Sequence, residues 1–273
     1  MPIIHSYLII PILLFLSCCS SATVTDPIPE HDSFIIHSSI VGESRTINVW
    51  TPPQYKLDSD LYPVMYMADG GIQEDFPHIA NTFAELIQAN KIPPMILVGI
   101  ENTQRRRDLT GPTFVAKDKE IAPIIGGSDK FRAFIEIELI DSIGQRYRTS
   151  ARKGILGESL SGLFVMETFF LAPHIFDVYI AFDPSLWWND HYLVKSAKDH
   201  LEKFTSQNKV LWFAGSDATD ISLYTKELAK ILQSQNLSNL EWTYSDEPNE
   251  QHHTIFRATK EKALIMALNP MNK

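Results

Sequence analysis

From residue 61 onwards, short and mostly apolar runs alternate with longer segments. The short runs are typical of strands and cover residues 62–68, 94–100, 154–156, 178–182, 209–215 and 240–245. The longer segments have apolar residues at helical spacing and cover residues 79–90, 160–172, 191–204, 221–235 and the C-terminal stretch from about Thr254. Strands without polar positions are typical of a parallel sheet with helices on both faces. The pattern therefore predicts an α/β fold that binds ligands at the carboxyl ends of its strands.

Two more strands are predicted ahead of this alternation, at residues 34–40 and 45–50. Both are rich in β-forming residues, and the short turn between them favours an antiparallel hairpin. A further helix is expected after Gly127, with Ser128 as its cap and one apolar face made of Phe131, Phe134, Ile135, Leu139 and Ile143. No linker interrupts the alternation, so we expect residues 23–273 to form one domain with a mostly parallel sheet and an N-terminal antiparallel hairpin.

The first 22 residues follow a different pattern. Residues 7–16 are ten apolar or aromatic residues, and small residues follow them. Ten residues are too few to span a bilayer but suit the apolar part of a secretory signal. We therefore expect a signal peptide over residues 1–22 and an exported protein, periplasmic or extracellular, with no transmembrane span. Cys18 and Cys19 follow the apolar run as in bacterial lipoprotein signals, so each is a candidate site for a lipid anchor.

Composition narrows the classes of function. The chain has two cysteines, both in this N-terminal segment, so the globular part has no disulfide framework and no cysteine-based metal site. Its formal net charge is -9, and it contains no extended basic stripe. Nucleic acid is therefore not an expected partner, because phosphate binding relies on clustered Lys and Arg. Nothing in the sequence implies a metal or an organic cofactor.

The triplet Gly-x-Ser occurs three times and ends at Ser44, Ser128 and Ser159. Ser44 falls in the predicted hairpin turn, and Ser128 at the predicted helix cap. Ser159 is different, because it lies between a predicted strand and a predicted helix. A strand, a sharp turn with an exposed serine and a helix together make the nucleophile elbow of serine hydrolases.

Small residues surround Ser159, as such an elbow requires. Gly157, Ser161 and Gly162 allow the backbones of strand and helix to approach closely. Ser161 stands where the usual motif has its second glycine. At the start of the helix, the N–H of Leu160 is placed to face an oxyanion that develops on a substrate.

A serine needs a base, and in this fold the partners follow the serine in the order acid, then histidine. Two loops after predicted strands contain them. Asp217 and Asp220 follow the strand 209–215, whereas His252 and His253 follow the strand 240–245. Glu158 and Asp183 lie near the predicted site, but we assign them no role.

Five stretches of the chain resemble one known family: VMYMADGG, NTQRRRDLTGP, GILGESLSGLFV, the strand that ends in DPSLWW, and EQHHTIF. The family is the putative esterases of the α/β-hydrolase superfamily, which includes siderophore trilactone esterases, S-formylglutathione hydrolases and mycolyltransferases. The resemblance runs from about Arg45 to the C-terminus. It implies the three-layer α/β-hydrolase sandwich, with His252 as base and His253 as the alternative.

The resemblance also implies the remaining site residues. It places the triad acid at Asp217, with Asp220 as the alternative. It places the second oxyanion donor at the backbone N–H of Gly71, with Gly70 and Ile72 as alternatives.

Three other residues are candidates for substrate binding. Trp187 and Trp188 follow the strand 178–182, where aromatic side chains either wall a pocket or pack in the core. Arg105 could hold an anionic substrate, whereas a structural ion-pair network is the favoured interpretation of Arg107 and Asp108.

These features predict a serine hydrolase that cleaves a small-molecule carboxylic ester through an acyl-enzyme on Ser159, with His252 and Asp217 as partners. Two alternatives stay open. An acyltransferase or thioesterase would use the same triad, because only the acceptor differs. A non-catalytic binding protein of the same fold is the other.

Overall fold

The computed structural model describes residues 26–121 and 123–269. The predicted signal segment and both cysteines lie outside these residues. All eight strands that are described belong to one sheet, in the order β1-β2-β4-β3-β5-β6-β7-β8. β1 and β2 pair antiparallel, β2 also pairs antiparallel with β4, and the pairs from β4 to β8 are parallel. The predicted α/β fold with an N-terminal antiparallel hairpin is confirmed.

The elements lie close to where the sequence pattern predicts them. The strands are β1 (Asp32–His37), β2 (Ser44–Trp50), β3 (Tyr62–Met67), β4 (Ile96–Ile100), β5 (Thr149–Glu158), β6 (Val178–Phe182), β7 (Lys209–Gly215) and β8 (Leu240–Asp246). The helices are α1 (Phe76–Gln88), α2 (Arg105–Leu109), α3 (Ala116–Ile121), α4 (Ser128–Ala133), α5 (Ile140–Arg146), α6 (Leu160–Leu171), α7 (Trp188–Glu202), α8 (Thr219–Gln235) and α9 (Ile255–Leu268). A 3₁₀ turn, η1 (Pro53–Lys56), and a π-helical stretch, η2 (Phe134–Leu139), complete the list.

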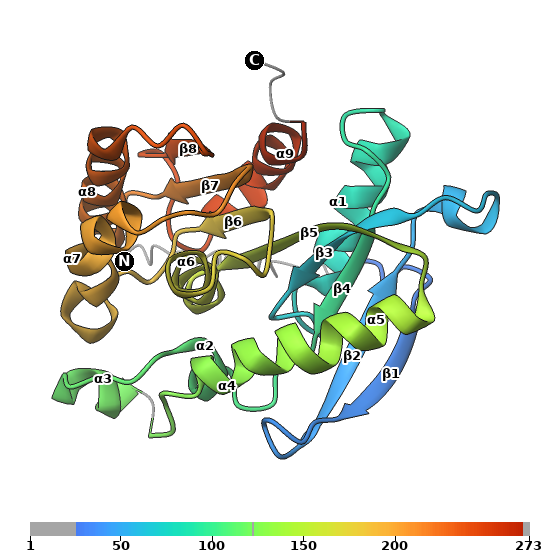
Figure 1. Cartoon of the computed structure of the whole chain (residues 1–273), viewed down its shortest axis with the longest axis horizontal. Helices are drawn as coiled ribbons and strands as arrows, with labels where there is room; N and C mark the ends of the chain where they lie inside the picture. Colours follow the sequence, from blue (N-terminus) through green and yellow to red (C-terminus); the bar gives the residue numbers. More distant parts are fainter. Residues whose placement is uncertain (1–25, 122, 270–273) are drawn as a thin grey trace, which may run out of the picture.

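Helices cover both faces of the sheet (Figure 1). Successive side chains of a strand point to opposite faces, and β3 shows this clearly. Val64 and Tyr66 pack with residues of α4, η2, α5, α6, α7 and α8, whereas Met65 and Met67 pack with residues of α1 and α9. The central strands β4 and β6 are buried at every residue, which explains why they are apolar throughout. The edge strand β8 is mostly half-buried and contains polar residues.

The helix that begins at Ser128 runs without interruption through α4, η2 and α5 to Arg146. Its predicted apolar residues are all buried: Phe131, Phe134, Ile135, Leu139 and Ile143. The prediction that Ser128 caps this helix is wrong. Gly127 occupies the cap position, and Ser128 is the first helical residue, with its side chain buried.

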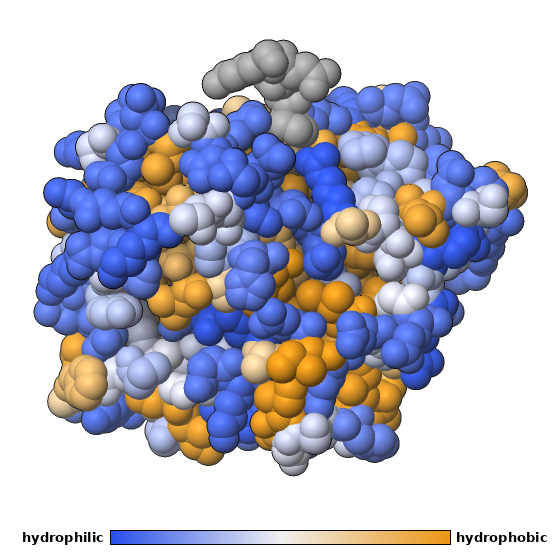
Figure 2. Space-filling model, viewed as in Figure 1, coloured by the Kyte–Doolittle hydropathy of each residue, from blue (hydrophilic) through white to orange (hydrophobic). Residues whose placement is uncertain are grey.

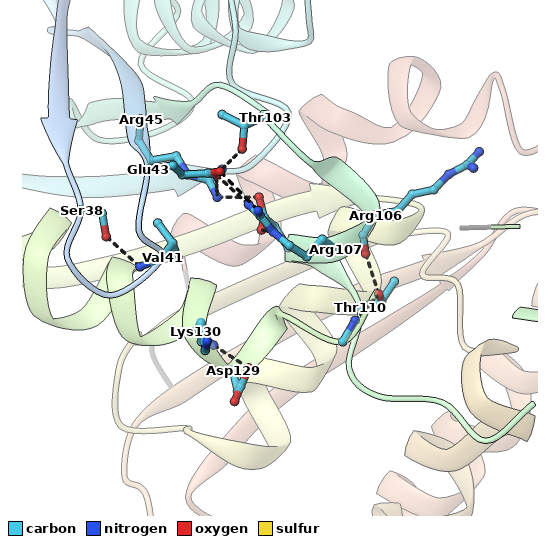
Figure 3. Close-up of polar contacts among 12 residues, drawn as sticks. Ser38, Val41, Glu43, Arg45, Thr103, Arg106, Arg107, Thr110, Asp129 and Lys130 are labelled. Carbon is cyan, nitrogen blue, oxygen red and sulfur yellow. Dashed lines mark hydrogen bonds and ion pairs between the residues drawn. The ribbon is translucent and has the colours of Figure 1, made fainter. Parts of the chain in front are cut away.

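A buried ion-pair network links the β1–β2 turn to α2 (Figure 3). Arg45 is fully buried, and its Nη2 lies 2.7 Å from both Asp108 Oδ2 and Glu43 Oε1. Arg107 contacts the same two carboxylates, at 2.7 Å from Asp108 Oδ1 and 2.6 Å from Glu43 Oε1. The predicted structural network around Arg107 and Asp108 is confirmed. It fixes α2, the helix that contains Arg105 and Arg106.

The face in Figure 2 is mainly polar, with apolar residues in separate patches. Within the described part of the chain, no helix has the length and apolar character to cross a membrane.

We expect Asp108→Ala to lower the free energy of unfolding by roughly 3–5 kcal/mol, because it leaves the buried Arg45 with one carboxylate in place of two. Urea unfolding measures the change. The control is Glu30→Ala, which removes the exposed Lys56–Glu30 pair (68% and 88% exposed side chains) and should leave the unfolding midpoint unchanged. Equal midpoints for Asp108→Ala and the wild type would contradict the role of this network.

Candidate active site

Ser159 lies on a sharp turn between β5 and α6. Its φ of 60° and ψ of -117° are strained values for a residue with a side chain. Backbone hydrogen bonds hold the turn: the N–H of Ser159 donates to the carbonyl of Phe182 at 3.0 Å, and its carbonyl accepts from the N–H of Ser185 at 3.1 Å. This is the geometry of a nucleophile elbow.

The small residues around Ser159 are required by packing. A Cβ on Gly157 would lie 2.2 Å from Ser161 Oγ, and a Cβ on Gly162 would lie 2.9 Å from the carbonyl oxygen of Phe182. Ser161 itself is buried, and no described residue pairs with its hydroxyl. A serine therefore fits at the place of the second glycine in the usual motif.

His252 contacts Ser159, as the sequence predicts. Its Nε2 lies 3.0 Å from Ser159 Oγ. The histidine lies on the loop between β8 and α9, where the hydroxyl of Thr254 accepts from the N–H of Gln251 at 2.9 Å and donates to Glu250 at 2.7 Å. The alternative histidine, His253, is exposed and makes no contact with Ser159.

The carboxylate that contacts His252 is Asp183, directly after β6, and not the predicted Asp217. His252 Nδ1 lies 2.7 Å from Asp183 Oδ2. Asp183 is fully buried and has a left-handed backbone, with φ of 45°. Asp217 is exposed, and its backbone N–H donates to the carbonyl of Glu250 at 2.9 Å. The alternative acid, Asp220, lines the cavity beside His252 but makes no hydrogen bond to it.

The loop after β7 still contributes a residue to the site, Ser216, which contacts Asp183. Its N–H donates to Asp183 Oδ1 and its hydroxyl donates to Asp183 Oδ2, both at 2.7 Å. β6 and β7 are parallel neighbours, so both loops reach the same edge of the sheet. The sequence signal for Asp183 is its place directly after an apolar strand, but Asp217 closely follows the neighbouring strand and so shares this signal.

Charge around His252 favours its protonated form. The hydrogen bond that His252 donates to Asp183 raises the pKa of His252 above its ordinary value, against the effect of partial burial, and the charge of Glu158 raises it further. Glu158 Oε1 lies 3.9 Å from His252 Nε2. Burial raises the pKa of Glu158 to about 7.

The backbone N–H groups of the two predicted oxyanion donors have different surroundings. Leu160 is the first residue of α6, so its N–H has no acceptor within the helix, and Leu160 lines the cavity beside Ser159. Gly71 differs from the prediction, because its N–H already donates to Glu74 Oε2 at 2.7 Å. The N–H of Gly70 donates to the carbonyl of Ile100 at 3.0 Å, which leaves Ile72 as the third alternative.

A cavity of about 400 Å³ opens onto Ser159 and His252. All three predicted substrate-binding residues line it: Arg105, Trp187 and Trp188. Arg105 is held by Asp69, with Nε and Nη2 at 2.6 and 2.8 Å from the two carboxylate oxygens. Arg106 also lines the cavity, and its guanidinium donates to the carbonyl of Ile121. Among residues 26–121 and 123–269, no group of His, Cys, Asp or Glu is arranged to hold a metal ion.

The sheet, the elbow and the histidine loop together define an α/β-hydrolase. The family model described as "Putative esterase" matches residues 38–262, and the chain belongs to this family of carboxylic ester hydrolases. The chain is 27% identical to the ferri-bacillibactin esterase BesA of Bacillus subtilis over 258 residues, which cover 84% of this chain and 87% of that protein. It is 38% identical to the siderophore triacetylfusarinine C esterase of Aspergillus fumigatus over 195 residues, 64% of this chain and 63% of that one.

A solved structure agrees with this assignment. The IroE-like serine hydrolase from Shewanella oneidensis superposes with a TM-score of 0.79 at 27% identity, over 88% of this chain and 80% of that one.

We expect Asp183→Asn to lower the pKa of His252, because the substitution removes the charge that stabilises the imidazolium while burial still opposes it. A pH titration of the His252 ring resonances by NMR measures the shift. Asp217→Asn is the matched control and should leave the midpoint in place, since Asp217 does not touch the ring. A shift in Asp217→Asn and none in Asp183→Asn would contradict the geometry described above.

Proposed function

We propose that the chain hydrolyses siderophore esters through an acyl-enzyme on Ser159. One observation carries the proposal: an unbroken chain of hydrogen bonds runs from Ser159 Oγ through His252 to the buried carboxylate of Asp183. A serine hydroxyl becomes a nucleophile when a positioned base accepts its proton, and here the base is itself oriented by a third group.

The reaction follows from this chain. His252 Nε2 accepts the proton of Ser159, and Oγ bonds to the ester carbonyl carbon. The N–H of Leu160 stabilises the oxyanion, with Ile72 as the candidate second donor. The ester C–O bond then breaks, and the imidazolium gives its proton to the departing alkoxide. A water molecule, deprotonated by His252, attacks the acyl-enzyme and releases the acid and the free serine.

Asp183 has two tasks in this proposal. It holds the imidazole with Nδ1 protonated, so that Nε2 is free to accept the proton from Ser159. It also stabilises the imidazolium that forms during the attack. The two hydrogen bonds from Ser216 keep the carboxylate aimed at the ring.

Two lines of support point to a siderophore substrate. Two relatives are named as siderophore esterases, one of them acting on a ferri-siderophore. The cavity lining also suits a large anionic and aromatic ester, since it joins Trp187 and Trp188 to the guanidinium of Arg106. Arg106 forms none of the ion pairs found among the described residues, whereas Arg105 is paired with Asp69. Arg106 therefore offers charge to a ligand.

We expect a fluorophosphonate probe to label the wild type and not Ser159→Ala, and we expect Ser159→Ala to lose turnover of both 4-nitrophenyl acetate and a ferric catecholate trilactone. The matched control is Ser44→Ala, which removes the serine of the other Gly-Glu-Ser triplet and should label and turn over as the wild type does. Gel fluorescence, absorbance and chromatography of the hydrolysed siderophore give the three measurements.

The outcomes separate the parts of the proposal. A wild type that neither labels nor hydrolyses either ester is a binding protein, and the whole proposal fails. A wild type that labels and hydrolyses only the acetate retains the mechanism on Ser159 and loses the siderophore substrate.

A further inference from the structure

A turn of left-handed backbone directly follows the two tryptophans of the cavity. Asn189, Asp190 and His191 have φ of 49, 53 and 59° and ψ of 51, 47 and 33°. L-residues adopt this conformation mostly as single residues, and Asn and Asp tolerate it best. Three such residues in a row, none of them glycine, need surrounding contacts to hold them. The contacts of this turn therefore indicate what it does.

Asn189 makes its contacts with one segment, residues 110–121, which we call the α3 segment. Its Oδ1 accepts from the N–H of Phe114 at 3.0 Å, and its own N–H donates to Asp118 Oδ2 at 2.9 Å. The hydroxyl of Thr113 donates to the same oxygen of Asp118 at 2.7 Å. Thr113 and Asp118 are both buried, at 5% and 4% exposure. Trp188 adds a bond from Nε1–H to the carbonyl of Gly111 at 3.0 Å.

These hydrogen bonds matter because the α3 segment has little apolar support. The side chain of Phe114 is 91% exposed, and Ile121 is 39% exposed. Asp118 is the one buried residue of helix α3. Figure 2 shows apolar residues at the surface on the lower left, over the region where Figure 1 places α3. A segment with few buried apolar contacts is held mainly by its polar ones.

The α3 segment forms part of the cavity wall. Thr110 and Ile121, at its two ends, line the cavity, as do Trp187 and Trp188. Asn189 does not line it. The left-handed turn therefore connects the tryptophan pair to the α3 segment, and it does so from outside the cavity.

We infer that Asn189 is a positioning residue that sets which acyl groups the cavity accepts. It fixes the α3 segment against the tryptophan pair, so that a bulky substrate meets a wall already in place. This inference rests on the proposed ester hydrolysis and adds a determinant of substrate size to it. The binding of a substrate too small to reach the wall does not depend on the side-chain contacts of Asn189, which we call the clamp.

The test compares Asn189→Gly with Asp190→Gly. Glycine adopts left-handed backbone freely, so Asn189→Gly removes the side-chain clamp without adding strain to the turn. Asp190→Gly makes the same change one residue later and removes only the exposed ion pair with Lys195. The substrates are 4-nitrophenyl acetate and 4-nitrophenyl benzoate, which share a leaving group and differ in the bulk of the acyl group.

For Asn189→Gly we expect KM for the benzoate to rise roughly tenfold with kcat nearly unchanged, because the loosened wall no longer positions the ring. KM for the acetate should stay within about twofold of the wild type, and Asp190→Gly should match the wild type on both esters. Thermal unfolding of both variants shows that they are folded.

Three results overturn the inference: unchanged kinetics on both esters, an equal fall in kcat on both, or the same change in Asp190→Gly. If the wild type does not hydrolyse the acetate, the proposed function fails. The wild type is therefore assayed before any variant is compared.

Discussion

The candidate active site depends on one buried carboxylate. Asp183 lies at the end of β6 with no exposure to solvent, and it accepts hydrogen bonds from Ser216 on one side and His252 on the other. A buried charge needs several partners, and these donors supply them. Three loops after neighbouring strands thereby meet at one point: those after β6, β7 and β8. Ser159 joins them from β5 through its contact with His252.

Sharp turns at the strand ends make this meeting possible. Asp69 after β3, Ser159 after β5 and Asp183 after β6 all have positive φ, and none of them is glycine. Each turn aims a polar side chain across the carboxyl edge of the sheet. Asp69 holds Arg105 in the cavity, Ser159 faces the histidine, and Asp183 holds that histidine in place. The strained turn at Asn189 belongs to the same edge, and there it fixes the cavity wall instead of a reacting group.

Local sequence patterns predict much of this arrangement. Wholly apolar strands predict a buried parallel sheet, and small residues around Ser159 predict the elbow, because both follow from contacts within a few residues. The carboxylate that contacts His252 was not predictable in this way. Asp183 and Asp217 follow adjacent parallel strands, so both loops reach the same edge, and choosing between them depends on which side chain turns inward. The buried contact between Ser216 and Asp183 decides it, and no sequence spacing reports that contact. Gly71 is a similar case, since its N–H is taken by a glutamate three residues away.

The most direct test of this account compares two variants in which an aspartate is replaced by the isosteric asparagine. The measurement is kcat/KM on 4-nitrophenyl acetate. Asparagine tolerates the left-handed backbone of Asp183, so Asp183→Asn removes the charge and leaves the turn intact. We predict a fall of roughly four orders of magnitude for Asp183→Asn, the loss typical when the carboxylate of a Ser-His-Asp triad becomes an amide. Asp217→Asn should stay within about twofold of the wild type, since its side chain touches neither Ser159 nor His252. Near-wild-type activity in Asp183→Asn, or the larger loss in Asp217→Asn, would contradict the account.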